Sequence, residues 1–176
     1  MRKLTNEEFK KIEDKLVKII GNNIKDLFGT YTAFLHLKNV FLLTENEFKK
    51  ISNIPQKNII LVGKHLGKFT RSDRFFLKIS ALNILEQYAS RKVWIKWSAE
   101  MNFLYGNNVS KSHVLKTSED IGKNEVVFLY NPKDTLLGYG ITTRDNRSFE
   151  KADHHSSYII RQCDKGEFLR EEQSIL

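Results

Sequence analysis

The first part of the chain opens with a helical pattern of apolar side chains. Between Thr5 and Gly21, apolar residues recur every three or four positions, which predicts an amphipathic helix. Thr5 and Glu8 have the spacing of a capping box, in which each side chain bonds the other residue's backbone. Gly21 suits the end of the helix. We therefore expect a helix between these two signals.

Extended and helical patterns then alternate as far as residue 90. Residues 31–37 and 40–43 are rich in aromatic and apolar side chains, and Lys38-Asn39 between them offers a tight turn, so a β-hairpin is expected. The pattern predicts a short helix over 45–51, a buried strand over 59–62, a basic loop between Gly63 and Gly67, a strand over 75–79 and helical spacing over 81–88.

The pattern changes near residue 91 to mostly short strands. Strands are expected at 93–95, 126–130, 136–143 and 158–160, with a short helix over 99–104 and a turn at 131–134. We therefore predict two domains, residues 1–90 and 91–176. The first is an α/β (α+β) domain with a mainly antiparallel sheet and flanking helices. The chain has only two prolines, so no Pro-rich linker separates the domains, and we expect them to pack directly together.

The composition is that of an ordinary folded protein, with 28% charged and 40% hydrophobic residues. No apolar run approaches the roughly 20 residues that span a bilayer, so no membrane helix is expected. The N-terminus has no apolar stretch typical of a signal peptide. A single cysteine excludes a disulfide within the chain and makes a reducing, intracellular compartment the expectation.

The charge is basic and unevenly distributed. Lys and Arg number 29 against 21 Asp and Glu, which gives a net charge of +8. Residues 1–90 carry +7 of this excess and residues 91–176 only +1. A basic balance indicates an anionic partner, most often nucleic acid, although a lysine-rich solvated surface is an equally good interpretation of charge alone.

No catalytic constellation is recognisable. The segment 63–69 has one residue too few for a phosphate-binding loop, and Phe69 stands where a hydroxyl would bind Mg²⁺. Asp153-His154-His155 lacks a second ligand cluster, which favours a surface loop over a metal site. Cys163 has no activating partner in the sequence and is interpreted as a half-buried small residue. We expect no catalytic residue, no metal and no cofactor.

Several segments together resemble one known family. They are 92–96, Ala99-Glu100, 103–107, 137–140 and 164–170 in the second half, and Leu4-Thr5, Gly29-Thr30-Tyr31, 66–70 and Ala81-Leu82 in the first. The second-half segments resemble a PUA domain, a small RNA-binding β-barrel. The whole chain resembles the nuclear import protein seven family of large (60S) ribosomal subunit biogenesis factors, and the Phe-Leu-Tyr-Gly-Asn block at 103–107 is quite specific to it.

The resemblance implies an N-terminal α/β domain followed by a C-terminal PUA β-barrel domain. It also implies an RNA-binding assembly factor in pre-rRNA processing, with pre-rRNA, pre-60S ribosomal particles and other ribosome assembly factors as partners. Such a protein is expected in the nucleus and nucleolus, with some in the cytoplasm. It is expected to be no enzyme, to bind no membrane and to be a monomer in isolation.

The resemblance also directs attention to the cations of the second half as RNA contacts. Arg161, Lys165 and Arg170 rank first, because they lie in and just after the last expected strand. The other candidates are Lys111, His113, Arg144, Arg147 and Lys151. Two departures from the family bear on this surface: Trp97-Ser98 replaces Pro-Gly, and His113 replaces a glycine. Because the second half is nearly neutral, a protein–protein adaptor with weak or no RNA binding is the alternative.

Overall fold

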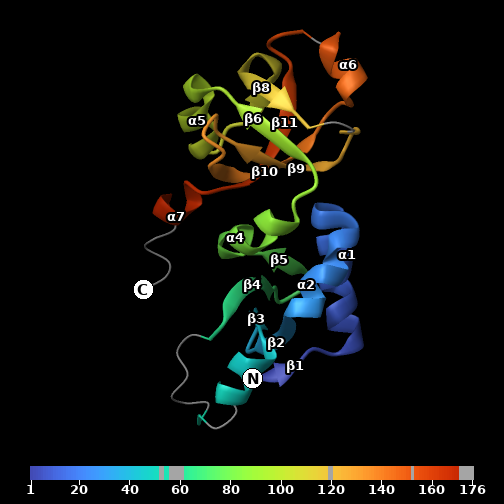
Figure 1. The fold of residues 1–176 in the computed structure, drawn as a ribbon, viewed down its shortest axis with the longest axis vertical. Helices are drawn as coiled ribbons and strands as arrows, with labels where there is room; N and C mark the ends of the chain where they lie inside the picture. Colours follow the sequence, from blue (N-terminus) through green and yellow to red (C-terminus); the bar gives the residue numbers. More distant parts are fainter. Residues whose placement is uncertain (52–53, 56–61, 119–120, 152, 171–176) are drawn as a thin grey trace. The chain divides into compact units, whose positions relative to one another are not determined.

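The computed structural model describes residues 1–51, 54–55, 62–118, 121–151 and 153–170 (Figure 1). The chain divides into two compact units, Met1–Tyr88 and Ala89–Leu176, close to the expected boundary after residue 90. Each unit has a sheet of its own, of five strands in the first and six in the second. None of the described helices is long and apolar enough to cross a bilayer.

The first helix, α1 (Asn6–Ile20), has the predicted bounds. The Thr5 hydroxyl accepts from the Glu8 amide, and the Glu8 carboxylate accepts from the Thr5 amide at 2.9 Å, which confirms the capping box. Gly21 follows with a φ of 58°, a left-handed conformation that glycine adopts without strain. One face of α1, including Ile12 and Leu16, is fully buried.

The sheet of the first unit is an antiparallel meander in the order β1-β2-β3-β4-β5. Its strands are β1 (Arg2–Lys3), β2 (Thr32–His36), β3 (Asn39–Leu43), β4 (Lys64–Phe69) and β5 (Phe75–Leu77). The expected helix over 45–51 is confirmed as α3 (Glu45–Ile51). A further helix, α2 (Ile24–Thr30), was not predicted, because Gly29 within it suggested the start of an extended segment.

The hairpin is confirmed, but its turn is displaced by one residue. His36 pairs with Asn39, so the turn residues are Leu37 and Lys38, and Leu37 has a φ of 55°. The basic loop predicted between Gly63 and Gly67 is wrong, since this segment enters β4. Gly67 is required there because a Cβ would collide with the Phe76 carbonyl oxygen of β5.

The last part of the first unit is helical, as expected. A 3₁₀ turn, Ile79–Ala81, leads into α4 (Leu82–Leu85) and a second 3₁₀ turn, Glu86–Tyr88. Residues 59–61 of the strand expected at 59–62 lie outside the described residues.

The second unit is a curled sheet in the order β7-β11-β10-β9-β6-β8, which forms a nearly closed barrel. Among the strand pairs that the described residues form in this sheet, β6–β9 is the one parallel pair. The strands are β6 (Lys92–Ile95), β7 (Val109–Ser110), β8 (Val114–Thr117), β9 (Val126–Tyr130), β10 (Leu136–Thr142) and β11 (Ser157–Asp164). The helices are α5 (Trp97–Leu104), α6 (Asn146–Glu150) and α7 (Glu167–Arg170). The interior is filled by residues such as Val93, Phe103 and Tyr158.

Candidate nucleic-acid interface

Two of the three cations ranked first for RNA contact are engaged in ion pairs within the chain. Asp164, at the end of β11, has a side chain with 0% exposure. Arg170 Nη2 donates to both of its carboxylate oxygens, at 2.9 and 2.8 Å, and Arg161 Nε also pairs with it. Arg161 Nη2 pairs with the Glu167 carboxylate. Because a buried carboxylate needs compensating partners, these arginines have a structural role.

The same network connects α7 to the end of α5. Arg170 Nη1 donates to the carbonyl oxygen of Leu104, the last residue of α5. Gly166 permits this approach, because a Cβ at that position would collide with the Leu104 carbonyl oxygen. Sequence reasoning placed Arg161 and Arg170 on an open RNA surface because a buried carboxylate partner is not visible in a pattern of charges. Their contact with RNA stays a prediction.

Lys165 is placed differently from the two arginines. Its backbone N–H donates to the Leu137 carbonyl oxygen at 2.7 Å, which joins the end of β11 to β10. Its ammonium group makes no ion pair with any residue that the structure describes. Lys165 therefore keeps its charge available at the surface.

Four other predicted cations surround α6, and we call them the α6 cation group: Lys111, Arg144, Arg147 and Lys151. Lys111 Nζ donates to the Glu150 carbonyl oxygen at 2.8 Å and lies 5.5 Å from the centre of the Phe149 ring. Arg144, Arg147 and Lys151 are exposed. Asp145 caps α6 by accepting from the Ser148 amide at 2.8 Å, and this hydrogen bonding lowers the pKa of its carboxyl. Arg161 and Arg170 thus belong to a paired network, whereas Arg144, Arg147 and Lys151 are exposed.

His113 lies in the 3₁₀ turn Lys111–His113 that leads into β8. Its backbone carbonyl accepts from the Lys96 amide at 2.9 Å, and its side chain is half-buried. Nδ1 is buried and has no hydrogen-bond partner among the described residues. The His113 imidazole is therefore folded partly against the protein.

Three adjacent strands carry an aromatic and basic surface that the sequence analysis did not predict. Trp94 of β6 lies between Lys116 of β8 and Tyr130 of β9 in the sheet register. Lys116 Nζ is 4.1 Å from the Trp94 ring centre, the two aromatic rings are 5.8 Å apart, and Lys92 Nζ is 5.4 Å from the Tyr130 ring centre. Tyr130 is buried, with 4% exposure, so the accessible part of this arrangement is the half-buried Trp94 ring with the Lys116 ammonium group beside it. Positive charge beside an accessible aromatic ring is what single-stranded nucleic acids bind.

Trp97, at the start of α5, extends this surface. Its side chain is 51% exposed, and Lys133 Nζ lies 5.6 Å from its ring centre. The neighbouring Asp134 accepts a hydrogen bond from Trp94 Nε1 at 2.5 Å. We call the set Lys92, Trp94, Trp97, Lys116, Tyr130 and Lys133 the β6 platform. Its signal in the sequence was the alternation around Trp94, since Val93 and Ile95 face the core and the indole between them must face outward.

The structure also places two groups that the sequence analysis weighed as candidates for catalysis or metal binding, Cys163 and the Asp153-His154-His155 segment. Cys163 is buried, and burial raises the pKa of its thiol to about 12, so it stays protonated and unreactive at neutral pH. Asp153, His154 and His155 are exposed in the connection between α6 and β11. Within the described ranges, no three His, Cys, Asp or Glu side chains are grouped closely enough to hold a metal ion.

Comparison with known proteins places both units in one family. Residues 1–79 match the family model described as "NIP7/UPF0113, pre-PUA domain", and residues 91–173 match the one described as "UPF0113 PUA domain". A Tetraodon nigroviridis protein named "60S ribosome subunit biogenesis protein NIP7 homolog" is 40% identical over 99% of both chains. The Schizosaccharomyces pombe "60S ribosome subunit biogenesis protein nip7" is 35% identical over the same share.

Solved structures share the fold over the full length. A conserved PUA domain protein from Thermoplasma acidophilum has a TM-score of 0.58 and 13% identity, and the match covers 96% of this chain and 95% of that one. A hypothetical protein from Pyrococcus horikoshii has a TM-score of 0.56 and 17% identity, with 92% of each chain covered. The expected α+β domain followed by a PUA barrel is thereby confirmed. The chain belongs to the NIP7/UPF0113 family, with a pre-PUA unit followed by a PUA unit.

Proposed function

We propose that this protein is an RNA-binding ribosome assembly factor that acts in pre-rRNA processing and biogenesis of the large ribosomal subunit. The observation that carries this proposal is the full-length similarity to proteins named for 60S ribosome subunit biogenesis. The matched PUA unit carries the β6 platform, in which lysine ammonium groups lie beside the Trp94 and Trp97 rings. Family membership does not say which residues contact RNA. The residues to be tested are therefore chosen from the geometry of the PUA unit.

The α6 cation group and the β6 platform are the surfaces best suited to RNA. Exposed arginine and lysine side chains bind phosphates and gain affinity by releasing counterions. The exposed indole of Trp97, with Lys133 beside it, suits stacking of an unpaired base next to a phosphate. Arg161 and Arg170 are less suited, because moving either guanidinium onto RNA would leave the Asp164 carboxylate buried without that partner.

The biological setting follows from the same proposal. Its partners are pre-rRNA, pre-60S particles and other assembly factors, and its location is the nucleus and nucleolus, with some protein in the cytoplasm. The protein acts as a monomer without enzymatic activity of its own.

A salt series with matched charge variants tests the RNA surface. Binding of a fluorescent single-stranded RNA is measured by anisotropy for the wild type, for Arg144→Ala/Arg147→Ala/Lys151→Ala and for Lys10→Ala/Lys15→Ala/Lys18→Ala. The control removes the same charge from exposed positions of α1. Each lost phosphate contact flattens the slope of log K against log salt by about 0.7, so the α6 variant should lose about 2 units of slope and the control none.

Equal slopes for the two variants would contradict the α6 assignment. If the wild type itself showed no measurable RNA affinity, the adaptor alternative would replace direct RNA binding. The near-neutral charge of the second half keeps that alternative in view. In that case, co-purifying assembly factors should survive nuclease treatment of a cell extract.

A further inference from the structure

The outer edge of the first sheet is only partly covered by its last strand. The two residues of β1 end their pairing with β2 at Lys3↔Phe34, and the chain then leaves the sheet to begin α1. In the described part of the chain, no strand pairs with Thr32 or Ala33 on that side, since β1 is the last strand in the sheet order. An unpaired strand edge offers backbone N–H and C=O groups to another extended chain.

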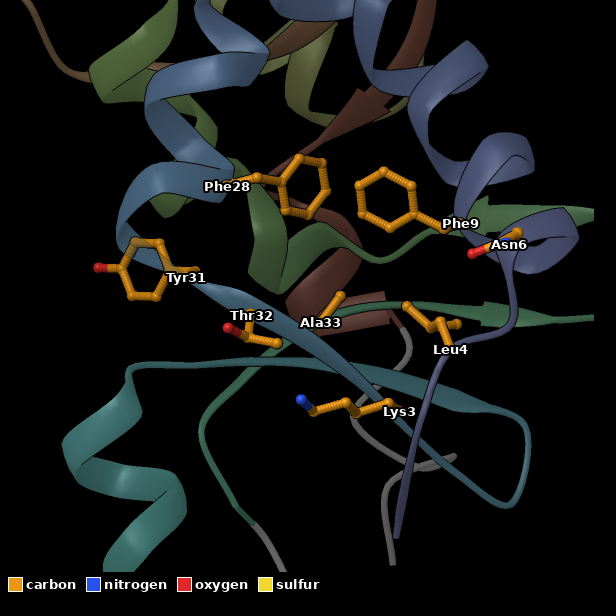
Figure 2. Close-up of a pocket in the computed structure, with 8 residues that line it drawn as sticks. All are labelled: Lys3, Leu4, Asn6, Phe9, Phe28, Tyr31, Thr32 and Ala33. Atoms are coloured by element: carbon orange, nitrogen blue, oxygen red, sulfur yellow. The ribbon is translucent and has the colours of Figure 1, made fainter.

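A hollow of about 310 Å³ opens beside this uncovered edge (Figure 2). Figure 2 shows the rings of Phe9 and Phe28, from α1 and α2, side by side above the strand that carries Thr32 and Ala33. The ring centres are 4.8 Å apart, and both rings are only half-buried. The described residues that line it are Lys3, Leu4, Asn6, Phe9, Phe28, Tyr31, Thr32 and Ala33.

A second, smaller hollow of about 130 Å³ flanks the same edge. Its lining is Lys3, Thr32, Phe34, Thr44, Glu45, Phe48 and Lys49. Phe34 and Phe48 stack there, with ring centres 4.4 Å apart and planes 13° from parallel. Ala33 lines the first hollow and Phe34 the second, and successive residues of a strand point to opposite faces of its sheet. The edge therefore has an aromatic-walled hollow on each face.

This geometry matches the recognition of a peptide by strand addition. In that mode, backbone hydrogen bonds to a sheet edge hold an extended peptide, and pockets receive its side chains. A strand that continued the line of β1 past Lys3 would direct one side chain into the larger hollow and its neighbour into the smaller one. Aromatic walls suit apolar or aromatic anchors, which supply most of the binding energy in such interfaces.

The charge around the edge indicates which residues of a bound peptide should flank its anchors. Lys3 lines both hollows, and Lys49 lines the smaller one. Lys64 Nζ donates to the hydroxyl of Tyr31 at 2.6 Å, at the rim of the larger hollow. Glu45 is the one acidic side chain in the two linings, and residues 1–90 carry a net charge of +7. Such a surface attracts an acidic segment and repels a basic one.

We propose that the β2 edge between these two hollows docks an extended acidic segment of a partner protein, with two adjacent apolar side chains as anchors. The segment adds to the sheet beyond Lys3, places one anchor against Phe9 and Phe28, and places the other against Phe48. This site lies in the first unit, whereas the proposed RNA surface lies in the second. The docking proposal does not rest on RNA binding, and variants of each unit test the two separately.

The probe is a displayed library of random 12-residue peptides, selected against the full-length wild type. The selected peptides should share two adjacent apolar residues flanked by Asp and Glu. Synthetic versions are then titrated by anisotropy against Lys3→Glu, Phe28→Ala and Phe48→Ala, with Lys15→Glu as the matched control. Lys3 and Lys15 are both exposed, so neither charge reversal removes packing from the core.

Lys3→Glu and Phe28→Ala are each expected to weaken peptide binding about tenfold or more, and Lys15→Glu by less than about twofold. The slope of RNA binding against salt should be the same in all these variants and the wild type. Failure to enrich acidic peptides, or binding that Lys3→Glu leaves intact, would overturn the proposal. Loss of RNA affinity in Lys3→Glu, Phe28→Ala or Phe48→Ala would also overturn the proposal, since the hollows would then bind RNA. Circular dichroism checks folding, and Lys3→Glu remains decisive if Phe28→Ala unfolds.

Discussion

At the scale of single residues, Asp164 determines what the nearby cations do. Its carboxylate is buried, accepts from Arg170 at 2.8 and 2.9 Å and also pairs with Arg161. Charges on β11 and α7 that resemble an RNA-binding row in the sequence are thus neutralised within the chain. Trp94 shows the converse. The sequence analysis assigned it to a strand and to the PUA-like segments without an RNA role, but its ring lies beneath the Lys116 ammonium group. Lys116 is distant in sequence from Trp94, so a local pattern does not contain that contact. Arg161 and Arg170 lie only three and six positions from Asp164, and what the local pattern does not reveal there is the burial of the carboxylate.

Replacing Asp164 is therefore expected to damage the fold more than any RNA contact. Asp164→Ala removes the shared partner of two partly exposed guanidiniums and should lower the free energy of unfolding by about 1.5–3 kcal/mol. Urea denaturation followed by circular dichroism measures this loss. Asp153→Ala, at an exposed position, is the control and should change stability by less than about 0.5 kcal/mol. Similar losses in the two variants would show that the Asp164 network contributes little.

At the scale of elements, the boundaries that local chemistry sets were predicted well. The capping box and the glycine stop of α1 involve residues a few positions apart, so the sequence contains the whole signal. Strand β4 was mistaken for a loop because its partners β3 and β5 come from other parts of the chain. The same limit applies to the docking edge, which exists because β1 ends after Lys3 and leaves Thr32 uncovered.

The cap of α1 should make stability depend on acid pH. Hydrogen bonding from Arg2, with further bonds from Thr5, lowers the pKa of the Glu8 carboxyl from 4.5 to about 2. A carboxyl whose pKa is lowered by folding contributes stability above its unfolded pKa and loses that contribution as pH falls toward the folded value. Glu8→Gln keeps the hydrogen-bonding shape of the box but removes the charge.

The variant should be less stable than the wild type by about 1 kcal/mol at pH 7, a small value because the ion pair is partly exposed. The difference should shrink between pH 4.5 and about 2, where the wild-type carboxyl becomes protonated. Urea unfolding of both proteins at a series of pH values measures this difference in the free energy of unfolding. Glu13→Gln, exposed on the same helix, is the control. A difference that stays constant across this range would contradict a role for the Glu8 charge.

At the scale of the whole molecule, the chain combines two units with separate sheets and different charge. The first unit holds most of the positive charge and the two-sided edge, and the second holds the β6 platform. Net charge alone would place RNA on the first unit, whereas the PUA match and the lysines beside Trp94 and Trp97 favour the second. The two proposals thus assign one macromolecular partner to each unit, and separating the units distinguishes them.

We expect each unit to fold when it is produced alone. Each has its own sheet and a continuous set of buried residues, and domains of fewer than 100 residues commonly fold by themselves. Fragments 1–88 and 89–176 should therefore give dispersed ¹H–¹⁵N spectra and cooperative urea transitions. Shift differences between each fragment and the full chain would map any surface that the units share. RNA should bind the 89–176 fragment, and the selected acidic peptides should bind the 1–88 fragment. A fragment with the spectrum of an unfolded chain would show that its stability depends on the other unit.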